Sequence, residues 1–248
     1  MCDGTVEEIQ AYCRELVGKL GTDRGGFIAK WDTQAGEGTF YDPLGLAVDH
    51  SGNVYDGESG HRRIQKSDCI QKFDSDGKIM ATWGSEPSGQ GQFRNPWGMA
   101  VDIAGNLYVS GNVDNCIQKL TSTGKLITKW GSKGSADGEF NGALSVALDA
   151  SGNIYGVDVL NHRNQKFTSD GKLIAKWGSK GSADGEFNRP SGVAVDRFDN
   201  VYVADRGNHR IQKFTSDGHF IVKWGSAGSD EGQFGDLIRV AVDDSGNV

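Results

Sequence analysis

The residues of this chain that could do chemistry recur at fixed places. The tripeptide Asn-His-Arg occurs twice, with its histidine at His162 and at His209. An aspartate stands five residues before each arginine, which pairs Asp158 with Arg163 and Asp205 with Arg210. Histidine with aspartate could form a general base or a metal site. The two copies belong to neighbouring units, however, so their histidines cannot share one metal ion at about 2.1 Å. We therefore interpret the histidines as motif residues and the Asp and Arg residues as ion pairs or turn ligands.

The remaining reactive residues form no recognisable constellation. His50, His61 and His219 lie in different turns, and no Ser-His-Asp or Cys-His arrangement can be placed. The cysteines contain no Cys-Xaa-Xaa-Cys pair and no zinc-like spacing. Cys69 and Cys116 occupy the same position of adjacent units, which are too far apart for a disulfide, so we expect free thiols. The sequence predicts no catalytic residues, no metal and no cofactor.

The elements that position these residues follow a fixed interval. Trp83, Trp130, Trp177 and Trp224 are spaced by 47 residues, and Trp31 precedes the first of them by 52. Two other residue types keep the same interval, at Asp102, Asp149, Asp196 and Asp243 and at Phe93, Phe140, Phe187 and Phe234. A period of this length is typical of solenoids, propellers and other repeat arrays.

Each repeat contains four short stretches that are typical of β-strands. In the unit that begins at Phe187, Val, Ile, Tyr and Phe are enriched at 192–195, 201–204, 210–214 and 219–224. Asp-Xaa-Xaa-Gly-Asn and Ser-Asp-Gly segments between them offer glycine where a turn needs positive φ. Four antiparallel strands per unit predict a propeller blade. The repeated Trp and the Phe ten residues later are predicted to pack between blades, with the glycine-rich stretch between them as the crossover.

The unit at Phe187 also carries a family pattern. It reads Pro190-Ser-Gly-Val-Ala-Val-Asp196, Asn200-Val-Tyr-Val-Ala-Asp205 and Asn208-His-Arg-Ile-Gln-Lys-Phe214, and it ends in Lys223-Trp-Gly. This pattern resembles the NHL repeat, a family of six-bladed propellers, and extends over 27–248 with repeats starting near 40, 93, 140, 187 and 234. The resemblance implies an all-β fold, an NHL-type β-propeller with about five blades' worth of sequence.

The ends of the repeat region do not complete a sixth unit. Residues 27–31 match the last strand of a blade, and 234–248 match the first strand and the start of the second. We expect an incomplete six-bladed ring, with a five-bladed ring or pairing with a second copy as alternatives. An open blade edge would invite self-association.

Two segments depart from the repeat. Residues 1–26 contain a capping-box pattern, Thr5-Val-Glu-Glu8, followed by apolar residues at helical spacing, so we expect an N-terminal amphipathic α-helix and linker. The hexapeptide Arg63-Ile-Gln-Lys-Ser-Asp68 is followed by the near-duplicate Cys69-Ile-Gln-Lys-Phe-Asp74. This insertion predicts a protruding loop around 59–68.

The candidate binding residues lie in the loops that are expected to crowd one face of a propeller, near the mouth of its channel. Trp97 is the only tryptophan outside the fixed interval, and it could either stack on a ligand or be partly buried against a neighbouring blade. The full set of candidates is Tyr41, Arg94, Trp97, Arg189, Arg206 and Arg239.

Composition limits the classes of partner. The formal charge of −7 disfavours RNA, which usually binds a basic surface, although the four arginines above could still form one basic face. The first residues lack the pattern of a secretory signal, and no stretch is long and apolar enough to cross a bilayer. We therefore expect no membrane association and a soluble, cytoplasmic protein.

Function is predicted less sharply than fold. Our leading hypothesis is a non-catalytic scaffold that binds a protein or peptide through its loop-rich face. One alternative is a fragment of a propeller hydrolase or lyase. The amidating lyases, which resemble this fold, hold zinc with histidines, but the matching positions contain none: Gly45, Gly98, Ser145, Gly192 and Arg239. The resemblance also implies a substrate- or RNA-recognition propeller of a ubiquitin-ligase-type protein, although no RING, B-box or coiled-coil sequence is present.

Overall fold

The computed structural model describes residues 43–59, 68–84, 92–243 and 245–248. These residues form four antiparallel sheets of four strands each, here called blades 1 to 4. Blade 1 contains β1 (Pro43–Val48), β2 (Val54–Glu58), β3 (Cys69–Phe73) and β4 (Ile79–Trp83), and blade 2 contains β5 (Pro96–Val101), β6 (Leu107–Gly111), β7 (Cys116–Leu120) and β8 (Leu126–Trp130). Blade 3 contains β9 (Ala143–Leu148), β10 (Ile154–Asp158), β11 (Arg163–Phe167) and β12 (Leu173–Trp177), and blade 4 contains β13 (Gly192–Val195), β14 (Val201–Asp205), β15 (Arg210–Phe214) and β16 (Phe220–Trp224). A short 3-10 helix, η1 (Arg206–Asn208), joins β14 to β15.

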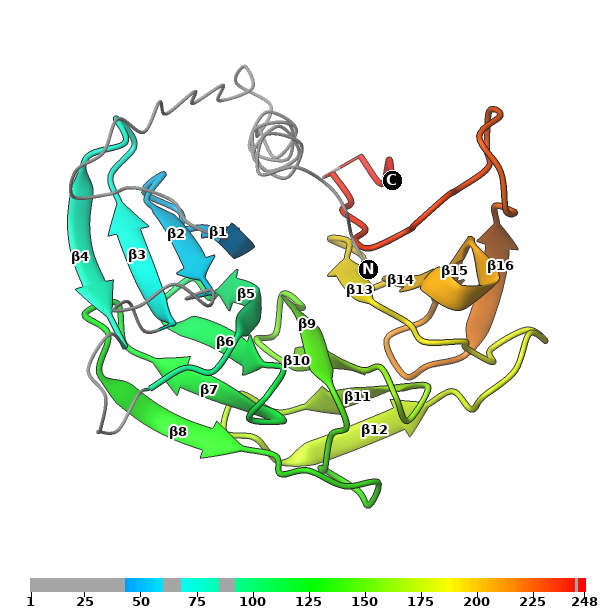
Figure 1. Ribbon diagram of the computed structural model, residues 1–248, viewed down its shortest axis with the longest axis horizontal. Coiled ribbons are helices and arrows are strands. Elements are labelled where there is room, and N and C mark those ends of the chain that lie inside the picture. Colours follow the sequence, from blue (N-terminus) through cyan, green and yellow to red (C-terminus); the bar gives the residue numbers. More distant parts are fainter. Residues whose placement is uncertain (1–42, 60–67, 85–91, 244) are drawn as a thin grey trace.

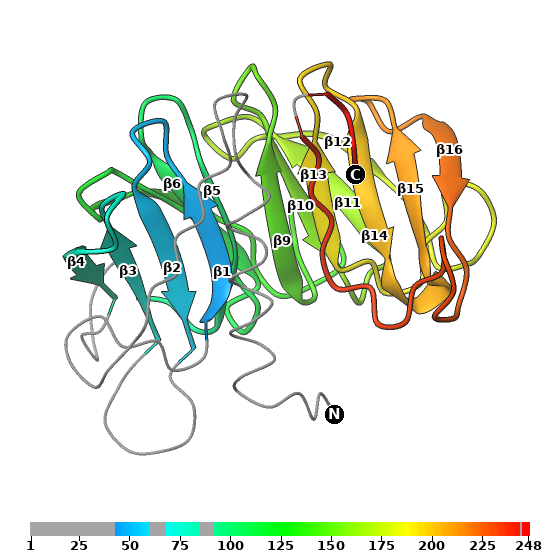
Figure 2. The same ribbon diagram turned by 90° about the horizontal axis from the view of Figure 1, so that it is seen from above.

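The blades stand around a common axis. Figure 1 looks down this axis and shows β1, β5, β9 and β13 on the inside of an open arc, with β4, β8, β12 and β16 on the outside. Inner strands of successive blades contact one another, and Figure 2 shows the blades side by side from a perpendicular direction. This arrangement confirms the predicted propeller architecture.

The strand prediction for the unit at Phe187 is confirmed closely. β13 and β15 have the predicted limits, β14 extends one residue further, and β16 begins one residue later. The turn prediction also holds, because Gly52, Gly105 and Gly152 have φ values of 80°, 80° and 78°. Local sequence therefore determines these elements, since each turn contains the residue that its backbone requires.

Aromatic residues fill the space between blades, as predicted. The ring of Trp130 in blade 2 lies 6.1 Å from that of Phe167 in blade 3, and Phe140 lies 5.7 Å from the same ring. The 169–171 turn of blade 3 closes over this contact with Gly171, whose φ is 90°. A Cβ atom there would lie 2.7 Å from the indole of Trp130, so the glycine is needed both for the turn and for the contact.

The inner strands approach one another closely near the axis. A Cβ atom on Gly98 would lie 2.5 Å from the carbonyl oxygen of Leu144 in the next blade. Beyond blade 4, the backbone of Arg239 makes the corresponding approach to Gly192, so 234–243 lies beside β13. Figure 1 shows this last segment on the inner side of the arc, next to β13.

Several sequence predictions concern residues outside the described ranges. These are the N-terminal helix in 1–26, most of the predicted loop at 59–68, and Tyr41. Cys69 and Cys116 are buried thiols that form no disulfide within the described residues, as predicted. Among the described residues, no helix has the length and apolar character needed to cross a membrane.

Candidate binding face

One face of the propeller is built from two kinds of loop. Lead-in loops at 92–95, 139–142 and 187–191 precede the inner strands β5, β9 and β13, and 234–238 is the corresponding segment after blade 4. Corners at 112–115, 159–162 and 206–209 join the second strand of a blade to the third. A side chain in one blade binds the lead-in loop of the next blade. The backbone N–H donors and their acceptors are Asn95 to Asp68 Oδ2 (2.5 Å), Gly142 to Asn115 Oδ1 (2.7 Å) and Arg189 to His162 Nδ1 (3.1 Å). Each corner therefore positions the loop of the following blade.

Backbone conformation explains the residue types at these corners. Asn115, His162 and His209 have φ values of 51°, 55° and 51°, in the left-handed region. Asn and His enter this region several times more often than most other non-glycine residues. The histidine of the Asn-His-Arg motif is thus a corner residue, as the sequence predicted.

The two motif histidines use Nδ1 in opposite ways. His162 Nδ1 accepts the N–H of Arg189. His209 Nδ1 lies 2.6 Å from the carbonyl oxygen of Gly235 and 3.1 Å from that of Phe234, so it must donate. The His162 ring is neutral when it accepts, and burial, followed by the positive charges of Lys180 and Arg189, lowers its pKa.

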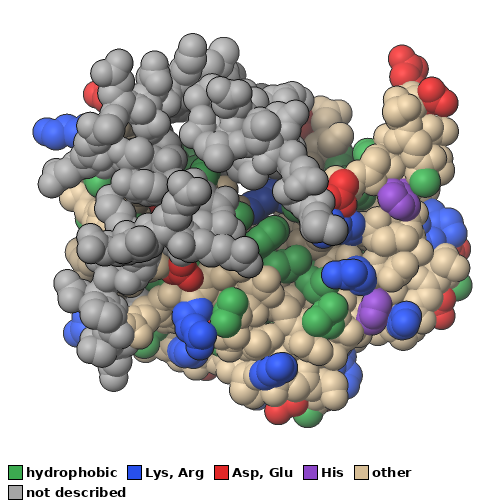
Figure 3. Space-filling view, viewed as in Figure 1, with side chains coloured by type: hydrophobic (Ala, Val, Ile, Leu, Met, Phe, Trp, Pro, Cys, Tyr) green, Lys and Arg blue, Asp and Glu red, His purple; other side chains and the backbone are tan. Residues whose placement is uncertain are grey.

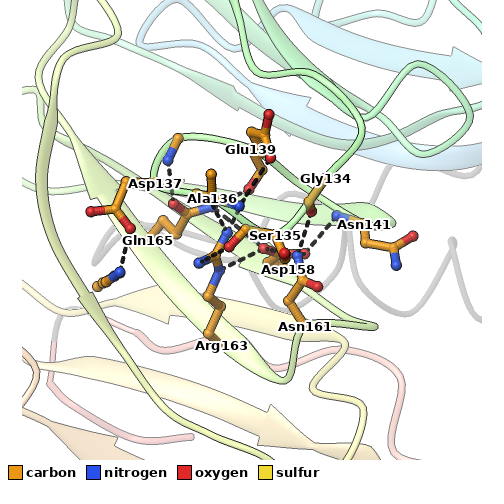
Figure 4. Close-up of polar contacts among 12 residues, drawn as sticks. Gly134, Ser135, Ala136, Asp137, Glu139, Asn141, Asp158, Asn161, Arg163 and Gln165 are labelled. Atoms are coloured by element: carbon orange, nitrogen blue, oxygen red, sulfur yellow. Dashed lines mark hydrogen bonds and ion pairs between the residues drawn. The ribbon is translucent and has the colours of Figure 1, made fainter.

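The predicted Asp–Arg pairs are confirmed, and they fasten the crossovers. Arg163 Nε donates to Asp158 Oδ2 at 2.8 Å, with Asp158 fully buried. The same guanidinium donates to the carbonyl oxygens of Ser135, Ala136 and Glu139 at 2.9, 2.7 and 2.8 Å. Figure 4 shows these contacts converging on the crossover between blades 2 and 3. Asp205 and Arg210 repeat the arrangement at 2.7 Å, so both pairs are structural.

At the other end of the blades, the turn aspartates are also occupied. Asp149 Oδ2 accepts the amide of Asn153 at 2.9 Å and the hydroxyl of Tyr155 at 3.2 Å, and Lys166 Nζ lies 3.2 Å away. Burial alone would raise the pKa of Asp149, but the hydrogen bonds from Asn153 and the lysine outweigh it and lower the pKa. This carboxylate holds a turn together.

The predicted binding residues separate into three groups. Arg94 and Arg189 are exposed on lead-in loops. Arg206 forms a bidentate ion pair with Asp236, at 2.5 and 2.8 Å. Arg239 Nη2 donates to the carbonyl oxygen of Trp97 at 3.1 Å, which joins the last segment to blade 2. The structure thus brings together Trp97 and Arg239 but not all the arginines.

The Trp97 side chain is half-buried. It packs against the apolar cluster between blades 3 and 4, which includes Leu144, Val157 and Val193. Its Nε1 is buried and has no hydrogen-bond partner among the described residues. Of the two roles considered from sequence, partial burial against a neighbouring blade is the one observed, and the backbone of Trp97 supplies the polar contact.

Sequence reasoning missed two buried carboxyl groups on β2. Asp56 and Glu58 are 2% and 3% exposed. Burial, followed by the negative charge of Glu58, raises the pKa of Asp56, and the positive charge of Arg239 opposes this rise. A signal was present, because the residue after the strand tyrosine is Asp56 in blade 1 but Val109, Gly156 and Val203 in the other blades.

These carboxyl groups do not form a metal site with other ligands. Within the described ranges, no group of three or more His, Cys, Asp or Glu side chains is arranged to hold a metal ion. The described residues of the face offer cations, amide donors and apolar side chains.

Comparisons with known proteins agree with this fold. The profile of the NHL repeat matches residues 187–214. Virginiamycin B lyase from Staphylococcus aureus is similar, with a TM-score of 0.54 and 19% identity over 73% of this chain and 54% of that one. A streptogramin B lyase has a TM-score of 0.59 and 16% identity over 82% and 60%, respectively. A protein of unknown function from Bacteroides caccae has a TM-score of 0.59 and 13% identity over 85% and 74%.

The fold and these structural similarities define a β-propeller. One unit of this propeller, at 187–214, matches the NHL repeat. It spans 54% and 60% of the length of the two lyases. A sequence search of curated proteins gave no match.

Proposed function

We propose that this propeller is a non-catalytic scaffold that binds a protein or peptide through the face of lead-in loops and corners. One observation carries the proposal: the repeat loses its regularity on this face. Residues 129–141 are identical to 176–188, and the identity stops within the next lead-in loop. There, Gly142, Ala143 and Leu144 in one blade correspond to Arg189, Pro190 and Ser191 in the next. A scaffold that recognises a ligand needs differences between its repeats at the binding loops.

The side chains on this face also suit a protein partner. Val113 and Leu160 are apolar corner residues that are 49% and 50% exposed. The exposed cations Arg94 and Arg189 lie on the lead-in loops. Figure 3 views the molecule along its axis and shows basic and apolar side chains interspersed over the blades that are not covered in grey. Exposed apolar side chains bordered by charge are typical of interaction sites.

Peptide selection followed by a matched pair of variants tests this proposal. A displayed random-peptide library would be selected on the full chain, and enriched peptides measured against Leu160→Glu and Phe198→Glu. Phe198 is 67% exposed and lies in the β13–β14 turn, at the other end of the blade. We expect Leu160→Glu to weaken binding roughly tenfold, as loss of a central apolar contact does, and Phe198→Glu to leave it unchanged. Peptides that respond to Phe198→Glu and ignore Leu160→Glu would contradict the proposed face.

A lyase or hydrolase activity is a second candidate, favoured by the buried Asp56 and Glu58. A carboxyl group whose pKa is raised by burial can act as a general acid or base near neutral pH. Two similar structures are lyases, and one virginiamycin B lyase was determined with quinupristin. The test incubates the chain with quinupristin and follows the mass of the compound. Conversion that Asp56→Asn abolishes would support catalysis, and an unchanged compound would remove this activity from consideration.

A further inference from the structure

The junction between blades 3 and 4 collects three nitrogen-bearing side chains on the binding face. His162 belongs to the corner of blade 3, Lys180 to the following crossover, and Arg189 to the lead-in loop of blade 4. The N–H of Arg189 donates to His162 Nδ1, and the charges of Lys180 and Arg189 both act on the His162 ring. Lys180 also forms a β-bridge with Phe187, two residues before Arg189, so the backbones of the three residues meet at one junction.

All three side chains retain hydrogen-bond donors. Because Nδ1 accepts, the proton of the neutral His162 ring lies on Nε2. In the part of the chain that the structure describes, no hydrogen bond or ion pair engages the Lys180 ammonium or the Arg189 guanidinium, whereas the His162 ring also contacts the backbone of Phe187. The junction offers two unengaged cations beside an imidazole ring.

The acidic groups around this junction are already engaged. Asp184 forms an ion pair with Lys223 at 2.5 Å, and Glu186 Oε2 accepts the N–H of Ala183 at 3.0 Å. Asp205, which also acts on His162, is buried and paired with Arg210. None of these carboxylates forms a bond to Lys180 or Arg189 within the described residues. The positive charge of the junction is therefore left for a ligand.

The equivalent junctions do not have this combination. Between blades 2 and 3, the corresponding residues are Asn115, Lys133 and Gly142, which provide one cation. After blade 4, they are His209, Ala227 and Asp236, and Arg206 neutralises the aspartate. The feature thus belongs to one junction and is not a property of the repeat.

We propose that His162, Lys180 and Arg189 form an anion-binding site for an aspartate- or glutamate-rich segment of a protein partner. This inference rests on the binding function proposed above and names the chemistry of the partner. A carboxylate can accept from the imidazole N–H and form charge-assisted hydrogen bonds with the lysine and arginine. Leu160, in the same corner as His162, supplies an apolar contact for the neighbouring residue of that segment.

An acidic peptide fits this junction better than RNA does. RNA affinity comes largely from many phosphate contacts along the backbone, and the chain has a net charge of −7. One cluster of two cations and an imidazole can neutralise one or two carboxylates without an extended basic surface. A short acidic segment needs fewer cations than RNA does, and an acidic protein can supply them at one place on its surface.

The test uses a fluorescein-labelled hexaglutamate peptide and its hexaglutamine counterpart at physiological ionic strength. We expect the wild-type chain to bind hexaglutamate and not hexaglutamine. Lys180→Glu should weaken binding by roughly tenfold, since a cation is replaced by a like charge. Lys133→Glu is the matched control, because Lys133 occupies the same position of an identical 13-residue sequence and the change in net charge is the same.

A transplant provides the complementary test. Asn115→His with Gly142→Arg would place the three residue types at the junction between blades 2 and 3, where Lys133 is already present. Arginine is compatible with the backbone at 142, since Arg189 has φ 53° at the equivalent position and Gly142 has φ 81°. We expect this double variant to bind a second equivalent of hexaglutamate and to restore binding to Lys180→Glu.

The outcomes separate this site from the wider proposal. Equal loss in Lys180→Glu and Lys133→Glu, or equal binding of hexaglutamine, would overturn the site. Stronger competition by a uridine hexanucleotide would overturn the peptide class in favour of RNA. If hexaglutamate fails to bind while library peptides still respond to Leu160→Glu, the binding face stands and this site is wrong. If neither peptide class depends on the face, both proposals fall.

Discussion

Blades 3 and 4 fasten their crossovers with a buried aspartate–arginine pair, whereas blades 1 and 2 have cysteine in place of the arginine. Cys69 and Cys116 correspond to Arg163 and Arg210, and all of these residues begin the third strand of their blades. In blade 2, Gly111 also replaces the aspartate. The strand pairing is nevertheless the same in all four blades. The ion pair is therefore not needed to form a blade, and its contribution lies in the loops that it holds.

A second contact is common to the described junctions. The amide of Gln118 donates to the carbonyl oxygen of Gln92 at 2.7 Å, and Gln165 and Gln212 make the same contact to Glu139 and Glu186. The glutamine thus attaches each of these crossovers, and the arginine adds three more carbonyl contacts in blades 3 and 4. The glutamine contact alone is enough to attach a crossover, and blades 3 and 4 hold their crossovers with additional hydrogen bonds.

The largest expected effect comes from breaking one reinforced pair. Arg163→Met would leave the Asp158 carboxylate buried without its cation, which typically costs roughly 3–5 kcal/mol of stability. Arg206→Met removes an arginine from the exposed pair with Asp236 and should cost at most about 1 kcal/mol. Urea unfolding of both variants measures the difference. Equal losses would show that the buried pair does not reinforce the blade.

Replacing both members of the Asp158–Arg163 pair by the residues of blade 2 should lower the free energy of unfolding less than replacing Arg163 alone. Asp158→Gly combined with Arg163→Cys removes both charges, so no unpaired carboxylate remains in the interior. We expect the double variant to be about 1–3 kcal/mol more stable than Arg163→Cys alone, the usual penalty for an unsatisfied buried group. A double-mutant cycle by urea unfolding measures this coupling. Additive losses would mean that the two side chains act independently.

The third strand of blade 3, β11, also contains a buried polar residue that departs from the other blades. Asn164 is fully buried, and neither polar atom of its amide has a hydrogen-bond partner among the described residues. The equivalent residues are Ile70, Ile117 and Ile211. Asn164→Ile should raise the free energy of unfolding by about 1–3 kcal/mol because it removes an unsatisfied buried group. Ile117→Asn is the reciprocal control and should lower it; a destabilised Asn164→Ile variant would indicate that the amide has a bound partner.

The features that the sequence predicts are those recorded at the fixed interval. Strands, turn glycines, interblade aromatics and the Asp–Arg pairs each recur, so every copy supports the interpretation of the others. The contacts that differ from blade to blade on the binding face do not recur at this interval. Arg239 reaches Trp97 over 142 positions of sequence, and Arg206 reaches Asp236 over 30. Such pairs depend on how blades are placed in space, which residue spacing alone does not determine.

The buried carboxyl groups illustrate a different gap. Asp56 departs from the residues at the equivalent position of the other blades, and this departure is visible in the sequence. The sequence does not show whether Asp56 is buried, because an acid in that position could face solvent or the interior. The structure shows burial beside Glu58 and the influence of Arg239, which together make the departure chemically significant.

The smallest effect concerns the pH dependence of the junction between blades 3 and 4. His162 has a lowered pKa in the fold, while in the unfolded chain it should titrate near 6.5, its ordinary value. Below that pH the unfolded chain binds more protons, so stability should fall as the pH drops toward the folded pKa and then level off. Protonation also removes the acceptor for the Arg189 N–H.

His162→Asn isolates this contribution, because asparagine occupies the same corner at Asn115 and can accept the N–H of the following loop. All other ionisable groups are present in both proteins, including the carboxylate of Asp205 that also acts on the ring. The difference in unfolding free energy between wild type and variant should therefore change with pH only below about 6.5. A difference that is constant from neutral to acidic pH would show that the ring does not titrate with folding, and that its contact with the Arg189 loop survives protonation.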